Sequence, residues 1–231
     1  MSVADAESAR FERQRLVPAL GPEGQQLFRD ARIHVVGAGA VAGPALLHLA
    51  QAGVGTIFVD DGADVDGAVD GDAGSWLYSP DQVGQPRLLA AIAALRAASA
   101  FVRVRACATD AEPTATLVCA QREPVARLAA ERARLAGLPH VVALGDGDGG
   151  AVVTIPSGAP CLRCALQPGA RVTPRPGASA AIGTLAAVEL LLVVARLLPG
   201  DGAGRRIDLV EGWPRVRPTA RTPGCDCRNV H

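Results

Sequence analysis

The most constraining feature of this chain is a glycine-rich turn that follows an apolar segment near its N-terminus. Residues 33–43 read Ile-His-Val-Val-Gly-Ala-Gly-Ala-Val-Ala-Gly, and the acidic residues Asp60 and Asp61 follow further along the chain. The pattern predicts a strand, a tight turn, a helix and a second strand that ends in carboxylates. This is the layout of a Rossmann nucleotide-binding unit.

Each part of this pattern has a physical reason if a nucleotide binds. Gly37 permits a tight turn, and Gly39 has no Cβ that would block a phosphate. Gly43 lies in the first turn of the expected helix, whose free N–H groups favour an anion. A carboxylate at Asp60 or Asp61 can accept hydrogen bonds from ribose hydroxyls. The pattern does not distinguish NAD, FAD and ATP, and a purely structural turn between strand and helix is the alternative.

The composition argues against several functional classes. The 231 residues are 49% apolar and have a formal net charge of zero, so a large core is available and no basic field recruits nucleic acid. Charges scattered through the first fifteen residues argue against a signal peptide. The longest apolar run, residues 180–198, contains Glu189 and Arg196, which favours a buried or interface helix over a membrane span. Cysteines without a secretory signal indicate a reducing compartment, so we expect a soluble cytoplasmic protein with no membrane partner.

Strands and helices are expected to alternate along most of the chain. Residues 1–30 are predicted to form an N-terminal arm with a short helix at residues 23–28, and residues 31–231 a single domain. The expected strands are residues 31–36, 56–60, 101–106, 117–119, 140–144, 151–155 and 207–210. The expected helices are residues 43–52, 86–98, 124–136 and 179–198, before an irregular tail. This alternation predicts an α/β fold with a mostly parallel sheet and helices on both faces.

Two glycine- or proline-rich segments are expected to be loops. Residues 145–150 contain two aspartates, but the spacing and terminal glutamate of an EF-hand are absent, so a hairpin loop is favoured over a calcium site. Residues 168–177 are rich in proline and arginine and are expected to form a crossover loop.

Four of the six cysteines form two close pairs, Cys161 with Cys164 and Cys225 with Cys227. Four thiolates complete a closed tetrahedral zinc site, which is structural because no position remains for water. The CxxC spacing is typical of zinc, whereas CxC is less usual. Free thiols and a redox-active CxxC are the alternatives, and the redox pair is disfavoured because a short strand is expected there instead of a helix start. Cys107 and Cys119 are expected to be inert core residues in apolar strands.

Six segments of the chain occur in an order that carries a family resemblance. They are Arg10-Phe11-Glu12-Arg13-Gln14, residues 20–25, Gly37-Ala38-Gly39, residues 52–55, residues 83–87, and Pro160-Cys161-Leu162-Arg163-Cys164 with the terminal cysteines. In this order they resemble the ThiF/MoeB/HesA superfamily, the adenylyltransferases related to ubiquitin-activating enzymes. The resemblance covers nearly the whole chain.

The resemblance implies a protein that binds Mg-ATP and activates a C-terminal carboxylate as an acyl-adenylate. The carboxylate would belong to a small ubiquitin-like or sulfur-carrier protein, or to a peptide. The resemblance also implies a homodimer in which Arg13 of one subunit reaches the nucleotide of the other. It aligns Arg87 with the family's lysine, so Arg13 and Arg87 are the expected catalytic residues. It divides the domain into a nucleotide-binding half, residues 31–145, and a zinc and carrier-docking half, residues 146–231. The C-terminal part is then an antiparallel extension of the Rossmann-like sheet, tied by zinc.

Several positions depart from the family pattern. Residues 70–75 read Asp-Gly-Asp-Ala-Gly-Ser where the family has Ser-Asn-Leu-x-Arg-Gln, so the phosphate-binding asparagine and arginine are absent. The family's metal-binding aspartate aligns with Gln121, and an amide is a poorer Mg²⁺ ligand than a carboxylate. Residues 60–72 contain six aspartates and no basic residue, which would repel ATP unless this loop swings away from the site.

These observations leave two main functional hypotheses. The first is an active adenylyltransferase with altered substrate handling. The second is a pseudoenzyme that keeps the fold as a scaffold or regulatory partner of an active paralogue. An NAD-dependent oxidoreductase rests on the glycine turn alone and is disfavoured by the cysteine pairs and the arginine-containing arm, because a fold does not fix a function.

Overall fold

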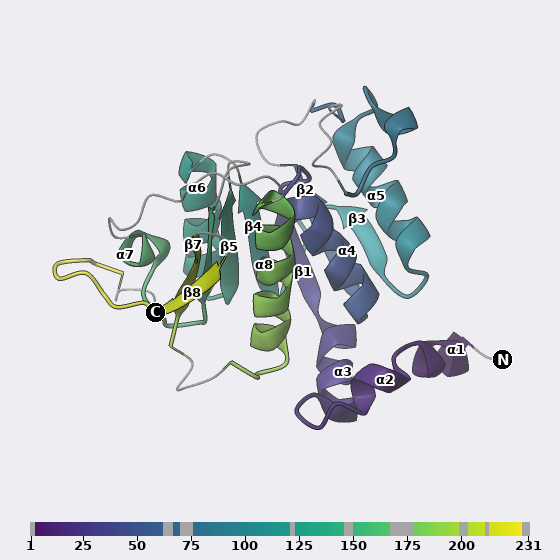
Figure 1. The fold of residues 1–231 in the computed structure, drawn as a ribbon, viewed down its shortest axis with the longest axis horizontal. Coiled ribbons are helices and arrows are strands. Elements are labelled where there is room, and N and C mark those ends of the chain that lie inside the picture. Colours follow the sequence, from purple (N-terminus) through teal and green to yellow (C-terminus); the bar gives the residue numbers. More distant parts are fainter. Residues whose placement is uncertain are drawn as a thin grey trace.

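The described residues form one eight-stranded sheet with helices packed against it (Figure 1). The computed structural model describes residues 3–61, 67–69, 76–120, 123–145, 150–166, 178–198, 203–210 and 213–227. The strands are β1 (Arg32–Val36), β2 (Thr56–Asp60), β3 (Arg103–Ala106), β4 (Ala115–Ala120), β5 (His140–Gly145), β6 (Gly150–Ile155), β7 (Arg205–Val210) and β8 (Trp213–Pro218). The helices are α1 (Val3–Arg10), α2 (Glu12–Arg15), α3 (Gly21–Asp30), α4 (Ala42–Ala52), the 3₁₀ turn η1 (Pro80–Gln82), α5 (Arg87–Ala98), α6 (Glu123–Leu135), α7 (Leu162–Ala165) and α8 (Ala178–Val194).

The strand order is β3-β2-β1-β4-β5-β6-β7-β8. Strands β3 to β5 pair in parallel, and the pairs from β5 to β8 are antiparallel. The chain leaves β1 toward β2 and β3 and then returns to place β4 on the other side of β1. This confirms a Rossmann-like α/β sheet, and the strands β6 to β8 form the antiparallel extension that the resemblance implied.

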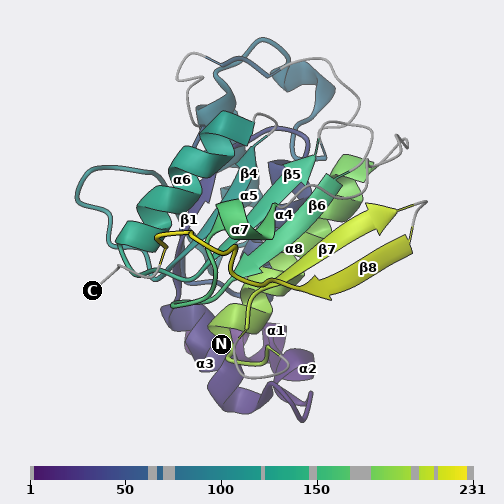
Figure 2. The ribbon, with the colours of Figure 1, turned by 90° about the vertical axis from the view of Figure 1, so that its left-hand side faces the viewer.

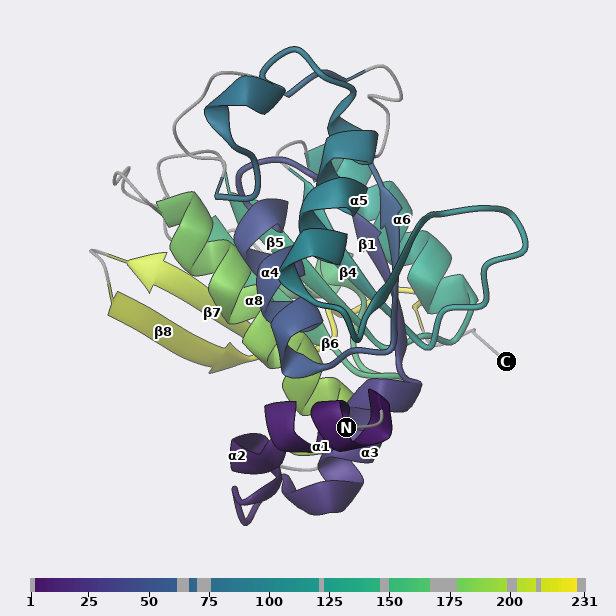
Figure 3. The same cartoon turned by 90° about the vertical axis from the view of Figure 1, so that its right-hand side faces the viewer.

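Helices cover both faces of the sheet, as expected. Figure 3 shows α4, α5 and α8 in front of the sheet, and Figure 2, from the opposite side, shows α6 and α7 in front of it. The alternation of side chains along β1 explains the two layers: Ile33 and Val35 join the core under α4, α5 and α8, whereas Val36 joins the cluster under α6. The central strands are therefore apolar on both sides.

Helix α8 is apolar on all sides because it packs against both α4 and the strands β4 to β6. Gly183 makes this close approach possible, since a Cβ at this position would lie 2.0 Å from the carbonyl oxygen of Val41. The helix ends at Val194, four residues before the predicted end, and Arg196 follows with a positive φ of 60°. None of the helices in the described part of the chain is long and apolar enough to cross a membrane.

The N-terminal arm contains three helices where one short helix was predicted. Its anchor is Phe11, which is 3% exposed and meets the ring of Phe101 edge-on at 5.9 Å between centroids. Gln25 donates a hydrogen bond from Nε2 to the carbonyl oxygen of Ala52 at 3.0 Å. Gly53 follows α4 with a φ of 90°, and a Cβ there would lie within 3 Å of Gln25 and Phe11. The arm therefore packs against the C-terminal end of α4.

The segment predicted as an irregular tail contains an additional strand, β8, so that prediction was wrong for residues 213–218. Strand β8 pairs with β7 and forms the exposed edge of the sheet (Figure 2). Pro214 and Pro218 hide this strand from sequence patterns, because proline cannot donate a ladder hydrogen bond and is tolerated mainly at sheet edges.

Two buried carboxylates hold β7 in place. Glu189 of α8 accepts hydrogen bonds from Thr154 Oγ1 at 2.6 Å and from Arg205 Nε and Nη2 at 2.7 and 2.6 Å. Asp208, which is 0% exposed, is held by the guanidinium groups of Arg206 and Arg217. Each buried charge is thus paired, as burial requires.

Candidate functional site

The glycine turn between β1 and α4 has the backbone conformation that only glycine adopts readily. Gly37 has a φ of 109°, and a Cβ at this position would lie 2.2 Å from the carbonyl oxygen of Cys119 in β4. Its N–H donates to the carbonyl oxygen of Asp60 at 2.6 Å. Gly37 is therefore required by the protein itself, because it lies between the ends of β2 and β4.

Gly39 differs, because a Cβ at this position would meet no described atom within 4 Å. The side-chain position of Gly39 therefore faces open space. Gly43 lies in the first turn of α4, donates to the carbonyl oxygen of Gly39 at 2.9 Å and packs near Leu77, whose Cβ would lie 3.2 Å from an added Cβ. Packing alone thus accounts for Gly43, whereas it does not account for Gly39.

The turn has the electrostatics of an anion site. No side chain caps the N-terminus of α4 at Val41, so the positive end of the helix dipole faces the turn, although the N–H of Gly43 already donates to Gly39 and Pro44 has no N–H. The turn also lies at the carboxyl end of β1, beside β4, where the strand order reverses. In open α/β sheets, ligands bind at this switch point. Tyr78 holds the turn by donating from Oη to the carbonyl oxygen of Ala38 at 2.6 Å.

The two acidic residues after β2 have different environments. Asp60 has a half-exposed carboxylate, with Oδ2 3.5 Å from His34 Nε2. Asp61 has a side chain that is 5% exposed, and its carboxylate forms an ion pair with Arg87 at the start of α5. Arg87 Nε donates to Oδ2 at 2.8 Å and to Oδ1 at 3.1 Å. The structure therefore brings together a predicted nucleotide-binding carboxylate and a predicted catalytic cation.

A groove on the α6 side of the sheet was not anticipated from the sequence. It has a volume of about 430 Å³ and runs between α6 and β1, with His34 and Asp60 at its polar side and Leu128 and Arg132 on the helix. Side chains alternate between the two faces of β1, so His34 lies on the same face as Val36, which is the face that carries the groove. The side chain was overlooked because β1 reads as a continuous apolar strand.

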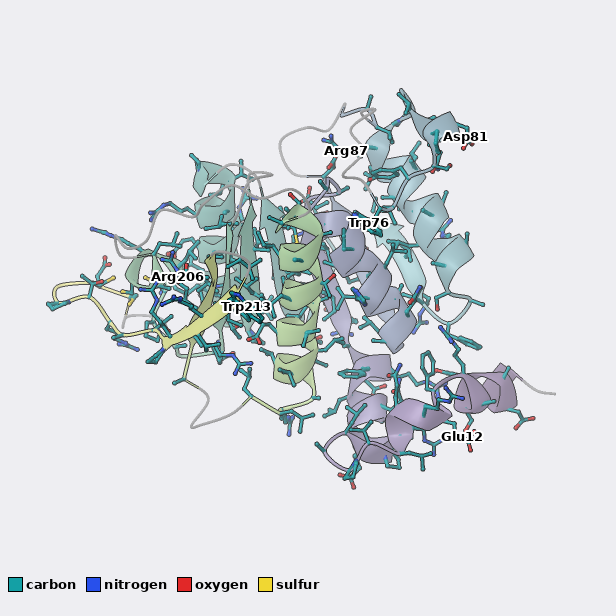
Figure 4. The ribbon with its side chains drawn as sticks, viewed as in Figure 1. Glu12, Trp76, Asp81, Arg87, Arg206 and Trp213 are labelled. Carbon is teal, nitrogen blue, oxygen red and sulfur yellow. The ribbon has the colours of Figure 1, made fainter. Side chains whose placement is uncertain are left out.

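Arg13 lies far from the glycine turn of its own chain. It is an exposed residue of α2, next to Glu12, which Figure 4 shows at the opposite end of the molecule from Arg87. Other predicted features lie outside the described residues: Asp64, Asp66, Asp70, Asp72, Gln121, residues 146–149 and residues 168–177.

The four cysteines of the CxxC and CxC segments converge near the C-terminal segment of the chain. Their Sγ atoms all lie within 4.8 Å of one another, with 3.7 Å between Cys161 and Cys164, 3.7 Å between Cys161 and Cys225, and 3.8 Å between Cys164 and Cys227. A tetrahedral zinc ion with Zn–S bonds of about 2.3 Å requires S–S separations of about 3.8 Å. A disulfide requires about 2.05 Å, so the cysteines are unpaired thiols with the spacing that zinc prefers.

The local backbone also suits a thiolate cluster. A helical turn, α7, starts at Leu162 with Cys161 at its N-cap, so the expected strand at the CxxC segment was wrong. Thr222 donates its backbone N–H to Cys164 Sγ at 3.3 Å. Burial raises the pKa of Cys164, but hydrogen bonds from Thr222 and the neighbouring thiols outweigh it and lower that pKa to about 7. Burial raises the pKa of Cys161 to about 12, so a metal ion would be needed to keep all four as thiolates.

The other two cysteines are not part of this cluster. Cys119 is buried in β4, which confirms it as a core residue, and burial raises its pKa to about 12. Cys107 lies just after β3 and is partly exposed, so the prediction that it lies in an apolar strand was wrong. Burial, and then the charge of Asp60, raise its pKa.

Comparison with known proteins identifies relatives of this chain. The sequence matches the ThiF family over residues 11–199. The adenylyltransferase and sulfurtransferase uba4 of Aspergillus fumigatus is 30% identical over 236 residues, which cover 94% of this chain and 46% of that protein. The sulfur carrier protein adenylyltransferase of Thermus thermophilus is 39% identical over 100 residues, which cover 43% of this chain and 36% of that protein. The chain thus spans less than half the length of these two relatives.

Solved structures share the fold at lower sequence identity. The crystal structure of E. coli MccB with MccA-N7isoASN has a TM-score of 0.76 and 17% identity, and covers 99% of this chain and 76% of that chain. The crystal structure of E. coli MccB with ATP has a TM-score of 0.68 and 17% identity, and covers 89% of this chain and 68% of that chain. At this level of identity the similarity concerns the fold.

Proposed function

This chain belongs to the ThiF family, and we propose that it binds ATP at the glycine turn to activate, or to dock, the C-terminus of a small ubiquitin-like or sulfur-carrier protein or a peptide. In the active form of this proposal, a carboxylate oxygen of the partner attacks the α-phosphorus of ATP. An acyl–phosphate bond forms, the bond to the leaving pyrophosphate breaks, and an acyl-adenylate results. Magnesium would offset charge on the phosphates.

The observation that carries the proposal is the open space at Gly39. Of the glycines in the turn, Gly37 is explained by Cys119 and Gly43 by Leu77, but no described neighbour explains Gly39. The space lies at the uncapped N-terminus of α4 and at the switch point of the sheet, where an anion is favoured. The half-exposed Asp60 ends β2 beside the turn, in a position suited to a ribose.

The relatives support the choice of ATP and of a partner with a free C-terminus. A. fumigatus uba4 and the T. thermophilus protein are named as adenylyltransferases, and E. coli MccB has been crystallised with ATP and with forms of MccA. We also propose a homodimer in the cytoplasm. Arg13 would serve the partner subunit's nucleotide, because the arm that carries it lies at the far end of its own chain (Figure 4).

Structural zinc is the second cofactor of this proposal. This part of the proposal is supported by three Sγ–Sγ separations of 3.7 to 3.8 Å among Cys161, Cys164, Cys225 and Cys227, which match those of four-coordinate zinc, and all four ligands are provided by one chain. The ion would join α7 to the C-terminal segment and would leave no open position for a substrate. The zinc would therefore stabilise the fold around the proposed docking half, residues 146–231.

A pseudoenzyme is the second candidate function, and the Asp61–Arg87 ion pair favours it. The basic residue that aligns with the family's lysine already has a carboxylate partner in the described structure. Under this hypothesis the chain keeps the fold and the partner surface but does not release pyrophosphate. The two candidates differ in turnover, so pyrophosphate release separates them.

Isothermal titration with Mg-ATP, followed by an assay of pyrophosphate release with candidate carriers and peptides, tests the proposal. We expect saturable ATP binding that Gly39→Trp abolishes, because the indole would project from a Cβ position that has no described atom within 4 Å, where the nucleotide is proposed to bind. Ala97→Trp, at an exposed position of α5, is the matched control and should bind ATP as the wild type does. Equal ATP binding by the wild type and a folded Gly39→Trp variant would refute the assignment of the site. Binding without pyrophosphate release would favour the pseudoenzyme.

A further inference from the structure

We propose that Asp61 limits how tightly the site binds nucleotide phosphates. Its carboxylate pairs with the guanidinium of Arg87, and a phosphate must displace that carboxylate in order to bind the same cation. This inference rests on the proposed nucleotide site at the glycine turn. It concerns Arg87, the described residue that aligns with the family's lysine. It also gives Asp61 a role different from that of Asp60, its neighbour in the sequence.

The contact between Asp61 and Arg87 is close and mostly removed from water. Nε of Arg87 lies 2.8 Å and 3.1 Å from the two carboxylate oxygens, and the side chains are 15% exposed for Arg87 and 5% exposed for Asp61. Charges at this distance attract more strongly in such a site than at the surface, where water screens them. A phosphate must therefore break this ion pair before it can form its own ion pair with Arg87, so part of its binding energy is lost.

The backbone around Arg87 further restricts the guanidinium. Arg87 N–H donates to the carbonyl oxygen of Gly67 at 2.8 Å, and Nη1 lies 3.5 Å from the carbonyl oxygen of Ala68. A Cβ on Gly67 would lie 2.4 Å from Nη2 of Arg87, so this segment closes directly over the cation. Ala68 in turn forms a β-bridge with Pro86, which holds the segment against the start of α5. The geometry thus keeps Arg87 facing Asp61.

The pair lies beside the proposed site and is connected to it. Asp61 follows directly after Asp60 at the carboxyl end of β2. Tyr78 links the two features, since its Oη lies 2.6 Å from the carbonyl oxygen of Ala38 in the turn and 3.4 Å from that of Arg87. In Figure 4, Arg87 lies at the end of the molecule where β1 and β2 end. A phosphate at the turn would therefore meet Arg87 and Asp61 together.

This arrangement makes affinity depend on the charge of the ligand. A phosphate that takes Arg87 leaves the carboxylate of Asp61 without its cation, and both anions then repel each other. The repulsion grows with the number of phosphate charges near the pair, so ATP is disfavoured more than AMP. Removing the charge of Asp61 should weaken the hold on Arg87 and should benefit ATP most.

The experiment is a double-mutant cycle measured by isothermal titration with Mg-ATP and with AMP. The proteins are the wild type, Asp61→Asn, Arg87→Gln and the double variant. Asp61→Asn should bind Mg-ATP at least about tenfold more tightly than the wild type, with a smaller gain for AMP. Arg87→Gln should weaken Mg-ATP binding, because it leaves the charge of Asp61 uncompensated beside the phosphates. The double variant should bind Mg-ATP no more tightly than the wild type, because it has no cation to offer the ligand. Asp81→Asn removes one negative charge from an exposed residue at the same end of the molecule and should leave the affinity unchanged (Figure 4).

The possible outcomes separate this inference from the proposed function. If the wild type binds Mg-ATP and a folded Asp61→Asn variant binds it no more tightly, the inference is overturned but the proposed nucleotide site stands. Binding by Asp61→Asn but not by the wild type supports the inference, and binding by neither protein overturns both. If Asp61→Asn does not fold, the double variant decides: it lacks the charge of Asp61, so it should bind Mg-ATP more tightly than Arg87→Gln, and equal affinity of these two variants overturns the inference.

Discussion

The Sγ atoms of Cys161 and Cys225 lie 3.7 Å apart, although 64 positions separate these residues in the sequence. The contact joins the N-cap of α7 to the C-terminal segment, which contributes little apolar surface of its own. Its position therefore depends on what occupies the space between the four sulfur atoms.

We predict one zinc ion per chain and its loss in Cys225→Ser. The variant should lose the metal and be destabilised by roughly 3 kcal/mol or more, because binding energy of a structural zinc site is folding energy. Native mass spectrometry counts the zinc, and urea unfolding measures the free energy. Cys107→Ser, outside the cluster, is the control and should retain the metal. A wild-type protein purified without chelators that carries no zinc would contradict the prediction.

Gly183→Ala should destabilise the protein, although the same change in an exposed helix usually stabilises it by about 1 kcal/mol. The sign is reversed because the new Cβ would lie 2.0 Å from the carbonyl oxygen of Val41 and would push α8 away from α4. We expect a loss of roughly 1–3 kcal/mol in urea unfolding, which is the range for overpacking. ATP binding should weaken as well, since Val41 is the N-cap of α4.

Thr184→Ala is the matched control for this change, because it alters the next residue of α8 without approaching Val41. It should leave stability within about 0.5 kcal/mol of the wild type. A stabilised Gly183→Ala variant would show that α4 and α8 have more freedom to separate than the structure indicates.

The stability of the protein should fall as the pH drops below about 6.5, in part because of His140. Burial lowers the pKa of His140 in the folded protein, and the neutral ring lies with Nδ1 3.0 Å from the carbonyl oxygen of Leu138. The unfolded chain therefore takes up a proton at higher pH than the folded protein does. This contribution to stability is fully present above the unfolded pKa and is lost as the pH falls below it.

Urea unfolding at pH 7.5 and pH 5.5 measures this effect. His140→Gln should reduce the difference in unfolding free energy between the two pH values, whatever its effect on stability at pH 7.5. His48→Gln, at an exposed position of α4, is the surface control. An unchanged difference in His140→Gln would assign the acid sensitivity to other groups, such as the cysteine cluster.

If Arg13 acts across a dimer, two inactive variants should complement each other. Arg13→Ala should weaken ATP binding and Gly39→Trp should abolish it. A mixture of the two, allowed to exchange subunits, forms dimers in which one intact turn faces one intact Arg13. We expect roughly half of the sites in such mixed dimers to recover wild-type affinity by titration. No recovery, with exchange verified by native mass spectrometry, would place Arg13 outside the site.

Local chemistry made the central fold predictable from the sequence. The turn at Gly37 requires glycine, the acidic residues end β2, and the strands alternate with helices, so the Rossmann-like arrangement follows from short-range patterns. The spacing of the cysteine pairs likewise indicated their convergence, which the Sγ distances confirm. These features depend either on residues that are neighbours in the sequence or on closely spaced cysteine pairs, whose spacing is typical of metal sites.

Other features depend on long-range contacts that no local pattern encodes. Arg87 was predicted to be a catalytic residue, but nothing in the sequence showed that Asp61, 26 positions away, would reach it. The helices of the arm are stabilised by Phe11 against Phe101, a contact between distant segments. Tertiary packing of this kind overrides weak local preferences.

Strand β8 also limits the ways in which another molecule can join the sheet. Pro214 and Pro218 occupy alternate positions of this edge strand, and neither has an N–H to offer to a ninth strand. The two residues thereby protect the sheet from edge-to-edge association with other copies. A carrier or peptide that approaches this side must be recognised through side chains such as Trp213, which is 75% exposed, instead of by extending the ladder.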